Sequence, residues 1–189
     1  MPAKLTYSAI TSLDGFVADE RGNFDWAAPD EEVHGFVNDR ERGIGTYLLG
    51  RRMYEVMKFW ETADAQPDEP EVFHDYARIW RNADKIVYSA SLDRVTTART
   101  RLERRFGADA VRSLKAQARA DLSVGGPHLA AEALRAGIVD ELHLYLVPHV
   151  IGRGNAALPE DVRLRLELVD QRRFASGVVY LGYRISLDE

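Results

Sequence analysis

Val124-Gly125-Gly126-Pro127-His128-Leu129 is the stretch of this chain that decides the fold. It ends a run of residues, 120–124, that is typical of a buried strand, and apolar residues at helical spacing follow it over 129–135. Where a strand is followed by two glycines and then a helix, the backbone amides and the helix N-terminus can face a pyrophosphate. Glycine lets such a ligand approach the main chain, because it has no Cβ. The alternative is a purely structural turn, since paired glycines are also a general turn signal.

Composition bounds the class of protein. Of the 189 residues, 46% are hydrophobic and 29% are charged, which predicts a single globular domain over 1–189. No apolar run reaches the ~18 residues of a membrane span and no signal segment is recognisable, so we expect a cytoplasmic protein with no membrane partner. A net charge of −5 argues against nucleic acid as a partner. The absence of cysteine excludes disulfides and thiolate catalysis, and the five histidines show no metal-ligand spacing, so no metal is expected.

Strands and helices alternate along the chain. The predicted strands are 4–10, 46–49, 85–89, 120–124, 141–148, 164–174 and 178–187. The predicted helices start at Pro29 and at residues 52, 72 and 129, with a further helix within 104–120. Loops are expected over 19–29 and 62–71, and the basic stretch 99–105 is interpreted as a solvated helix or loop face. This order predicts an α/β fold, in which helices flank a central mixed, mostly parallel sheet with a C-terminal antiparallel hairpin.

A second candidate phosphate site is Gly50-Arg51-Arg52-Met53-Tyr54-Glu55. It too lies where a predicted strand gives way to a helix, and the planar guanidinium group of arginine can donate paired hydrogen bonds to a phosphate. Ligands of α/β sheets bind at the carboxyl ends of the strands, where both glycine junctions are expected. The alternative is that Arg51 and Arg52 are surface arginines paired with Glu55 or other acids.

At this point the chain resembles the dihydrofolate-reductase-like superfamily, in particular its branch related to the reductase domain of riboflavin biosynthesis. The resemblance runs over nearly the whole length. It rests on the two glycine junctions above and on further motifs in the same order, namely Ser12-Leu13-Asp14-Gly15, Val87-Tyr88-Ser89, Val139-Asp140-Glu141-Leu142, Pro148-His149-Val150-Ile151-Gly152-Arg153-Gly154 and Ser176-Gly177-Val178-Val179-Tyr180.

The resemblance implies NADPH as cofactor. Arg51, Arg52 and Ser89 would hold the adenosine 2′-phosphate, with Gly50 and Met53 in the same junction. The pyrophosphate would lie on Gly125, Gly126, Pro127, His128 and Leu129. The first strand and the loop after it would flank the nicotinamide through Ala9, Gly15, Phe16 and Val17. Two positions depart from the family pattern: Met53 replaces the usual threonine, and Ala90 replaces an arginine that often follows the serine.

The identity of the catalytic acid stays open at this level. In dihydrofolate reductases a carboxylate on the first helix binds and helps to protonate the pterin, and Glu32 lies close to the matching place. Its alternative role, together with Asp30 and Glu31, is to cap the helix and compensate its dipole. Asp14 is the rival, because the resemblance places it near the nicotinamide, although an aspartate before glycine is usually a turn residue.

Other parts of the site are assigned by residue type. Trp26 and Phe36 are candidate substrate-binding residues, with packing in the core as the alternative for an aromatic ring. His128 could reach a phosphate, whereas His143 and His149 are interpreted as structural. The riboflavin-type reductases pair through their C-terminal strands, which implies a homodimer here through 142–147 and 178–187. Burial of both strands within one subunit is the alternative.

Two classes of function follow. The first is an NADPH-dependent oxidoreductase that transfers hydride to a small heterocycle or a sugar-bearing pyrimidine, as in 5-amino-6-(5-phosphoribosylamino)uracil reduction. The zinc deaminase domain of the bifunctional riboflavin enzymes needs cysteine ligands, which this chain lacks, so only the reductase half is expected. The second is a non-catalytic regulatory or sensor protein that has kept the NADPH site. A true dihydrofolate reductase is disfavoured by the Asp14-Gly15 turn.

Overall fold

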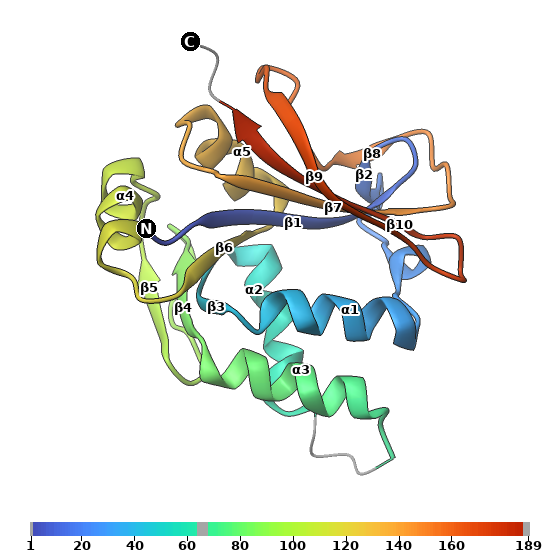
Figure 1. Ribbon diagram of the computed structural model, residues 1–189. Helices are drawn as coiled ribbons and strands as arrows, with labels where there is room; N and C mark the ends of the chain where they lie inside the picture. The colour runs from blue at the N-terminus through green and yellow to red at the C-terminus, as the bar shows by residue number, and fades with distance from the viewer. Residues whose placement is uncertain (1, 64–67, 187–189) are drawn as a thin grey trace.

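A computed structural model describes residues 2–63 and 68–186 and shows one eight-stranded sheet with helices on both faces (Figure 1). The strand order is β5-β4-β3-β6-β1-β7-β10-β9. The bounds of these strands are β1 Leu5–Ser12, β3 Ile44–Gly50, β4 Asp84–Tyr88, β5 Thr100–Glu103, β6 Asp121–Gly125, β7 Glu141–Val147, β9 Arg165–Arg173 and β10 Val179–Ser186. The helices are α1 Glu31–Glu41, α2 Arg51–Met57, α3 Glu71–Asn82, α4 Ala108–Gln117 and α5 Pro127–Arg135, and short 3₁₀ turns cover Asp25–Ala27 and Lys58–Glu61.

The sheet is parallel except for β10, which runs antiparallel to β7 on one side and to β9 on the other. The predicted mostly parallel sheet with a C-terminal antiparallel hairpin is therefore confirmed. Its central strands are buried, as expected for parallel strands covered by helices on both faces. Four residues of the predicted loop 62–71, residues 64–67, and the last residue of the predicted strand 178–187 lie outside the described residues.

Three apolar clusters hold the layers together. The largest joins the central strands to α4 and α5 on one face of the sheet. On the other face, one cluster joins β3 and β4 to α2 and α3, and another joins β7 and β10 to α1. The carboxyl ends of β3 and β6 emerge between these layers, so the loops that follow them are set on a rigid base.

Two features differ from the sequence expectation. The interpretation of residues 99–105 as a helix or loop face was wrong, because Thr100–Glu103 forms the edge strand β5 beside β4. A separate two-stranded sheet, β2 Phe16–Asp19 with β8 Gly154–Ala156, was not expected. These strands are only three or four residues long, and the pairing with a distant strand, rather than an apolar pattern of their own, determines them.

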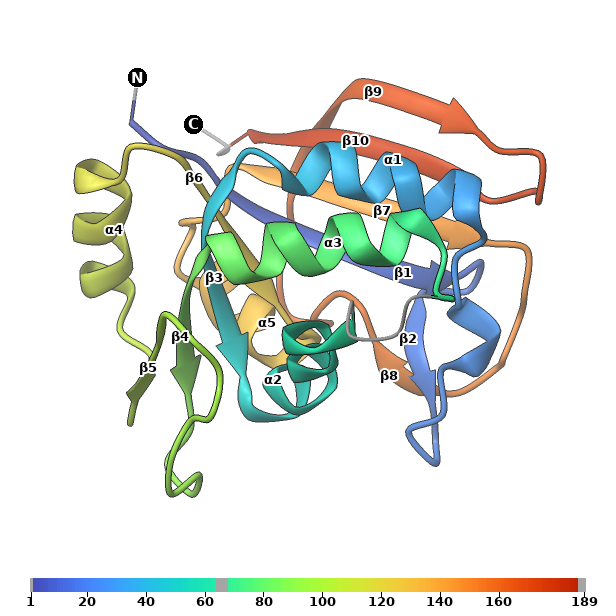
Figure 2. The ribbon, with the colours of Figure 1, turned by 90° about the horizontal axis from the view of Figure 1, so that it is seen from below.

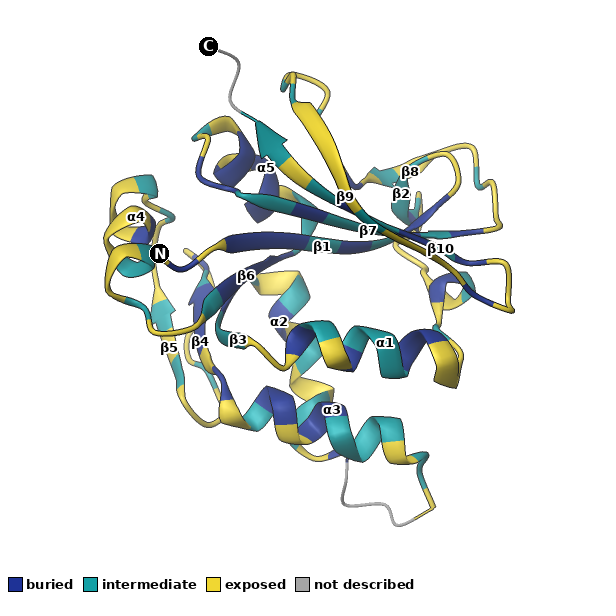
Figure 3. Ribbon diagram, viewed as in Figure 1, coloured by how far each residue is buried: buried dark blue, intermediate teal, exposed yellow. Residues whose placement is uncertain are grey.

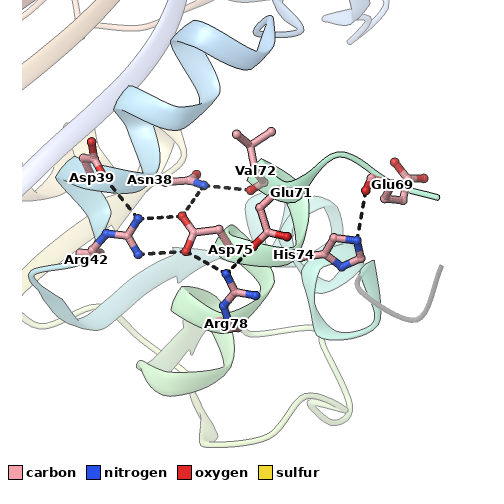
Figure 4. A network of polar contacts seen from close by, with 9 residues as sticks. All are labelled: Asn38, Asp39, Arg42, Glu69, Glu71, Val72, His74, Asp75 and Arg78. Atoms are coloured by element: carbon pink, nitrogen blue, oxygen red, sulfur yellow. Dashed lines mark hydrogen bonds and ion pairs between the residues drawn. The ribbon is translucent and has the colours of Figure 1, made fainter. Parts of the chain in front are cut away.

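Helix α1 lies beside α3, and a polar network bonds the two (Figures 2 and 4). Asp75 is at its centre, where its carboxylate accepts hydrogen bonds from both Arg42 Nη atoms at 2.9 and 2.8 Å and from Asn38 Nδ2 at 2.9 Å. Asn38 Nδ2 also donates to the carbonyl oxygen of Val72. The Arg42 guanidinium is the main reason that the pKa of Asp75 lies below its usual value.

Replacing Asp75 by alanine is expected to lower the free energy of unfolding by about 2 kcal/mol, because several charge-assisted hydrogen bonds are lost together. A carboxyl group with a lowered folded pKa stabilises the protein above its unfolded pKa and ceases to do so as the pH falls through its folded pKa. The loss should therefore shrink below about pH 4. Urea unfolding at neutral and acidic pH measures this difference, with Asp109→Ala, an exposed i,i+3 pair to Arg112, as the control. An equal loss in both variants would contradict the central role of Asp75.

Candidate cofactor and substrate site

The two glycine junctions lie side by side at the carboxyl edge of the sheet. β3 and β6 are neighbours, with Leu49 opposite Gly125, and Gly50 then leads into α2. Residues that are 76 positions apart in the sequence, Leu49 and Gly125, thus meet because parallel pairing aligns the ends of the strands. The structure brings together the two sites that the sequence pattern predicted separately.

The turn from β6 into α5 depends on both glycines. Gly126 has φ of 92°, a conformation that residues with a Cβ rarely adopt. A Cβ on Gly125 would lie 2.8 Å from Leu49 Cδ2 and 3.2 Å from Met53 Cγ. The close approach that requires glycine at position 125 is therefore to the neighbouring strand and to α2. Within the described chain no side chain caps the start of α5, so the amides of its first turn have no capping partner, and His128 in that turn is exposed.

The arginines at the start of α2 are paired neither with Glu55 nor with any other acid among the described residues, although the alternative interpretation expected such a pair. Glu55 bonds to Lys58 at 2.5 Å instead. Arg51 donates from Nη1 to Ser91 Oγ at 2.8 Å, and Arg52 has no hydrogen-bond or ion-pair partner among residues 2–63 and 68–186. Both side chains are exposed. Neither guanidinium group is paired with an acid in the described part of the chain, so an anion at the start of α2 would complement both charges.

Two further residues join this site that sequence analysis missed. Ser91, in the loop after β4, is the hydrogen-bond partner of Arg51, whereas the predicted Ser89 uses its hydroxyl to accept from the amides of Ser91 and Leu92. Arg104 follows β5 and donates to the carbonyl oxygen of Leu92 at 2.6 Å. No local sequence pattern marks these two residues. They come close to α2 because β3, β4 and β5 are adjacent and end at the same edge of the sheet, so only the strand order could have indicated them.

The residues expected beside the nicotinamide lie at the end of β1 and in β2. Ala9 is buried in the sheet, Gly15 accepts a hydrogen bond from the amide of Ala157, and Phe16 starts β2 opposite Ala156. Val17 packs against the large cluster on the α5 side of the sheet. The first strand and its following loop thus form one wall near the carboxyl edge.

Asp14 acts as a bridge between two loops. Its carboxylate accepts hydrogen bonds from the amides of Ile151 at 3.2 Å and Gly152 at 2.7 Å, which lie between β7 and β8. The Ser12 hydroxyl and these amides lower the pKa of Asp14 below its usual value. An exposed carboxylate of this kind is deprotonated at neutral pH and is poorly suited to donate a proton.

Glu32 is held by the C-terminal hairpin. Oε1 accepts from Arg172 Nη2 at 2.9 Å and Oε2 accepts from the amide of Ala175 at 3.1 Å. The predicted cap of α1 is provided by Asp30, whose carboxylate accepts from the amide of Val33 at 2.9 Å. Glu32 therefore neither caps the helix nor has a free carboxylate. Its role as the acid stays a prediction.

The two candidate substrate-binding aromatics have different surroundings. The ring of Phe36 packs edge-on against Phe174 and Tyr180, and the guanidinium groups of Arg40 and Arg172 lie about 5 Å from its centre. These packing contacts explain the position of the Phe36 side chain without a role in substrate binding. Trp26 is half-buried, with its ring centre 6.3 Å from that of His149, and its buried Nε1 lacks a hydrogen-bond partner in the described structure.

Comparison with known proteins gives the family. The sequence model that describes the RibD C-terminal domain matches residues 3–180, which is almost the whole chain. This chain belongs to the RibD C-terminal domain family. The resemblance stated from the sequence is thereby confirmed.

Among the relatives of this RibD C-terminal domain protein is "Uncharacterized protein YyaP" of Bacillus subtilis strain 168, which is 27% identical over 182 residues, 95% of this chain and 94% of the relative. A "Putative riboflavin biosynthesis protein" from Shewanella sp. PV-4 superposes with a TM-score of 0.73 at 20% identity, covering 98% of this chain and 99% of that one. Dihydrofolate reductase from Enterococcus faecalis, in complex with NADP(H), has a TM-score of 0.57 at 16% identity, with 96% of each chain covered. At such identities the two structures establish the dihydrofolate-reductase-like fold. In the part of the chain that is described, no helix has the length and apolar character needed to span a membrane.

Proposed function

We propose that this protein is an NADPH-dependent reductase of the riboflavin-biosynthesis type, acting on a small heterocycle or a sugar-bearing pyrimidine. The observation that carries the proposal is the pair of uncompensated guanidinium groups, Arg51 and Arg52, beside an uncapped glycine turn. Family membership and the likeness of the fold to that of an NADP(H)-binding reductase support it.

The residues present fit the chemistry of this cofactor. A dinucleotide with a 2′-phosphate carries negative charge at two places, and the carboxyl edge offers two donor sets. Arg51, Arg52, Ser91 and Arg104 would hold the 2′-phosphate, and the backbone of Gly126, His128 and Leu129 would hold the pyrophosphate. When bound, the nicotinamide supplies the hydride that reduces an imine or carbonyl carbon.

In the proposed reaction the protein's residues position the cofactor and substrate rather than donate the proton. Asp14 fixes the loop after β1 against the loop before β8, which keeps the wall around Gly15 and Phe16 in place. Since both Asp14 and Glu32 are engaged by hydrogen bonds, we assign the proton to water that reaches the site. Of the two candidate aromatic residues, Trp26 and Phe36, Trp26 is the one on which a flat substrate would stack.

The engaged acids also favour a second candidate, a regulatory or sensor protein that binds NADPH without turnover. Oxidation of NADPH, followed with pterins and ribosylamino-pyrimidines as substrates, distinguishes the two. Consumption that depends on the substrate supports the reductase. Tight NADPH binding with no consumption across both substrate classes supports the sensor, and failure of NADPH to bind excludes both.

Glu32→Gln is expected to change turnover by less than about threefold. If Glu32 were the general acid, the loss would be ~10²-fold or more and smallest at low pH. Because its carboxylate instead bonds to Arg172 and Ala175, the glutamine variant should lose about 1 kcal/mol of stability, the scale of a weakened exposed ion pair. Steady-state kinetics over a range of pH and thermal unfolding measure the two effects. Arg172→Gln, which breaks the same bond from the other side, should lose somewhat more stability, because the Arg172 guanidinium also lies over the rings of Phe36 and Phe174.

A homodimer through the C-terminal strands is the expected assembly, and we propose the strand at that edge of the sheet as the part that pairs. Strands β7 and β10 are both inside the sheet, each with a neighbour on either side, and of the two edge strands, β5 and β9, it is β9 that lies next to β10 (Figure 3). β9 is nine residues long and exposes Leu166, Leu168 and Val169 among charged residues, and the unpaired backbone groups of a long exposed edge strand can pair with another chain. We propose that two copies pair through β9. Sedimentation at micromolar concentration should give a dimer that Leu168→Lys converts to monomer, and a wild-type species near 21 kDa would refute it.

A further inference from the structure

Tyr54 is a buried tyrosine of α2, three residues after Arg51, and its hydroxyl bonds to a distant loop. The oxygen accepts hydrogen bonds from the backbone amides of Thr96 at 2.8 Å and Thr97 at 3.3 Å. Thr97 Oγ1 donates to it as well, at 3.3 Å. One phenolic oxygen thus fixes the far end of the connection between β4 and β5.

The near end of the same connection carries Ser91, the partner of Arg51. Ser89 Oγ accepts from the amides of Ser91 and Leu92 at 3.3 and 3.0 Å, which closes a tight turn directly after β4. Leu92 and Val95 then pack against the cluster that contains Tyr54. The loop is therefore bonded to α2 at two points, through Arg51 near its start and through Tyr54 near its end.

These two points are not equivalent when an anion is bound. A phosphate held by Arg51 competes with Ser91 for the guanidinium donors, so the first attachment is weakened at the moment of binding. The attachment through Tyr54 does not involve Arg51 and persists. We infer that Tyr54 is a positioning residue, whose hydroxyl keeps Ser91 beside Arg51 and thereby determines the preference for a 2′-phosphorylated dinucleotide. This inference rests on the proposed NADPH-dependent function.

The chemistry of the hydroxyl agrees with such a role. Burial raises the pKa of the Tyr54 phenol, but the hydrogen bonds from Thr96 and Thr97 outweigh it, and the net pKa lies below the usual value. The surroundings thus favour a phenolic oxygen that accepts hydrogen bonds, because several donors point at it. Phenylalanine would keep the packing of the ring and remove only the hydroxyl, with its hydrogen bonds to Thr96 and Thr97.

The test is Tyr54→Phe in the full chain, with dissociation constants for NADPH and NADH measured by fluorescence titration. We expect NADPH to bind about tenfold more weakly and NADH to change by less than about twofold, because only the former needs the 2′-phosphate contacts. Tyr180→Phe is the matched control, since its buried hydroxyl lacks a hydrogen-bond partner among the residues the structure describes. It should leave both constants unchanged.

Hydrogen exchange without nucleotide provides a second readout. Peptides covering 89–99 should exchange faster in Tyr54→Phe than in the wild type and the control. If exchange is unchanged, or if it rises while the NADPH preference stays at the wild-type value, the inference is overturned and the proposed function stands. If the wild-type protein binds NADPH no better than NADH, the proposed function fails, and the inference fails with it.

Discussion

Replacing Arg51 and Arg52 together by alanine is expected to weaken NADPH binding by about a hundredfold and to leave NADH binding nearly unchanged. Each charge-assisted contact to a phosphate contributes roughly 1.5–3 kcal/mol, and every 1.4 kcal/mol is about tenfold in affinity. Neighbouring contacts to one group do not add fully, so the double variant should lose less than the sum of two single variants. Arg51→Ala or Arg52→Ala alone should each cost about thirtyfold, so full additivity would exceed the loss expected of the double variant. Fluorescence titration with both nucleotides measures these differences.

The control for these variants is Arg112→Ala, an exposed arginine of α4 that pairs with Asp109 and lies on the opposite face of the sheet from α2. It removes the same net charge without touching the site, so any general effect of charge on a dinucleotide appears in it as well. A wild-type protein that binds both nucleotides equally, or a double variant that keeps the NADPH preference, would contradict the assignment of the 2′-phosphate to this junction.

Glu41→Gln is expected to stabilise the folded protein by up to about 3 kcal/mol above neutral pH. Burial raises the pKa of Glu41 to about 7, although the neighbouring Tyr47 offsets part of that effect. In the window from its unfolded pKa near 4.5 up to about 7, the folded protein holds a proton that the unfolded chain has released. The free energy of unfolding therefore falls as the pH rises through this window. A difference of this size in pKa corresponds to about 3 kcal/mol once both states are ionised.

Chemical unfolding at about pH 5 and pH 8 measures this effect, and the gain should appear only at the higher value. Glu31→Gln, an exposed carboxylate at the other end of the same helix, is the control and should show no such pH dependence. A Glu41→Gln variant that is no more stable than the wild type at the higher pH would contradict the buried, uncompensated carboxylate. Glu41 lies next to the start of β3, away from Gly50 at its end, so cofactor binding should be unaffected.

The parts of the fold that the sequence predicts are those whose signals are local. Buried parallel strands read as short apolar runs, and the turn at Gly125, Gly126 and Pro127 is encoded by backbone preferences that no other residues share. The same holds for the capping of α1 by Asp30. In each case the pattern and the structure that it specifies lie within a few residues of each other.

The parts that the sequence does not predict depend on distant partners. Glu32 bonds to a residue 140 positions away, and Asp14 bonds to amides 137 and 138 positions away. No local pattern distinguishes such carboxylates from free ones. Ser91 and Arg104 enter the site only because β4 and β5 pair next to β3, and β5 is too short and too exposed to be recognised by its own composition.

Helix α1 is bonded along two sides, to α3 through Asp75 and to the C-terminal hairpin through Glu32–Arg172 and Arg40–Asp170. A helix fastened in this way cannot shift toward a ligand without breaking one of the two sets of bonds. The position of α1 on the sheet is therefore fixed before any ligand arrives. A ligand that contacts α1 should then bind without the entropy cost of ordering this helix, which is a form of preorganisation.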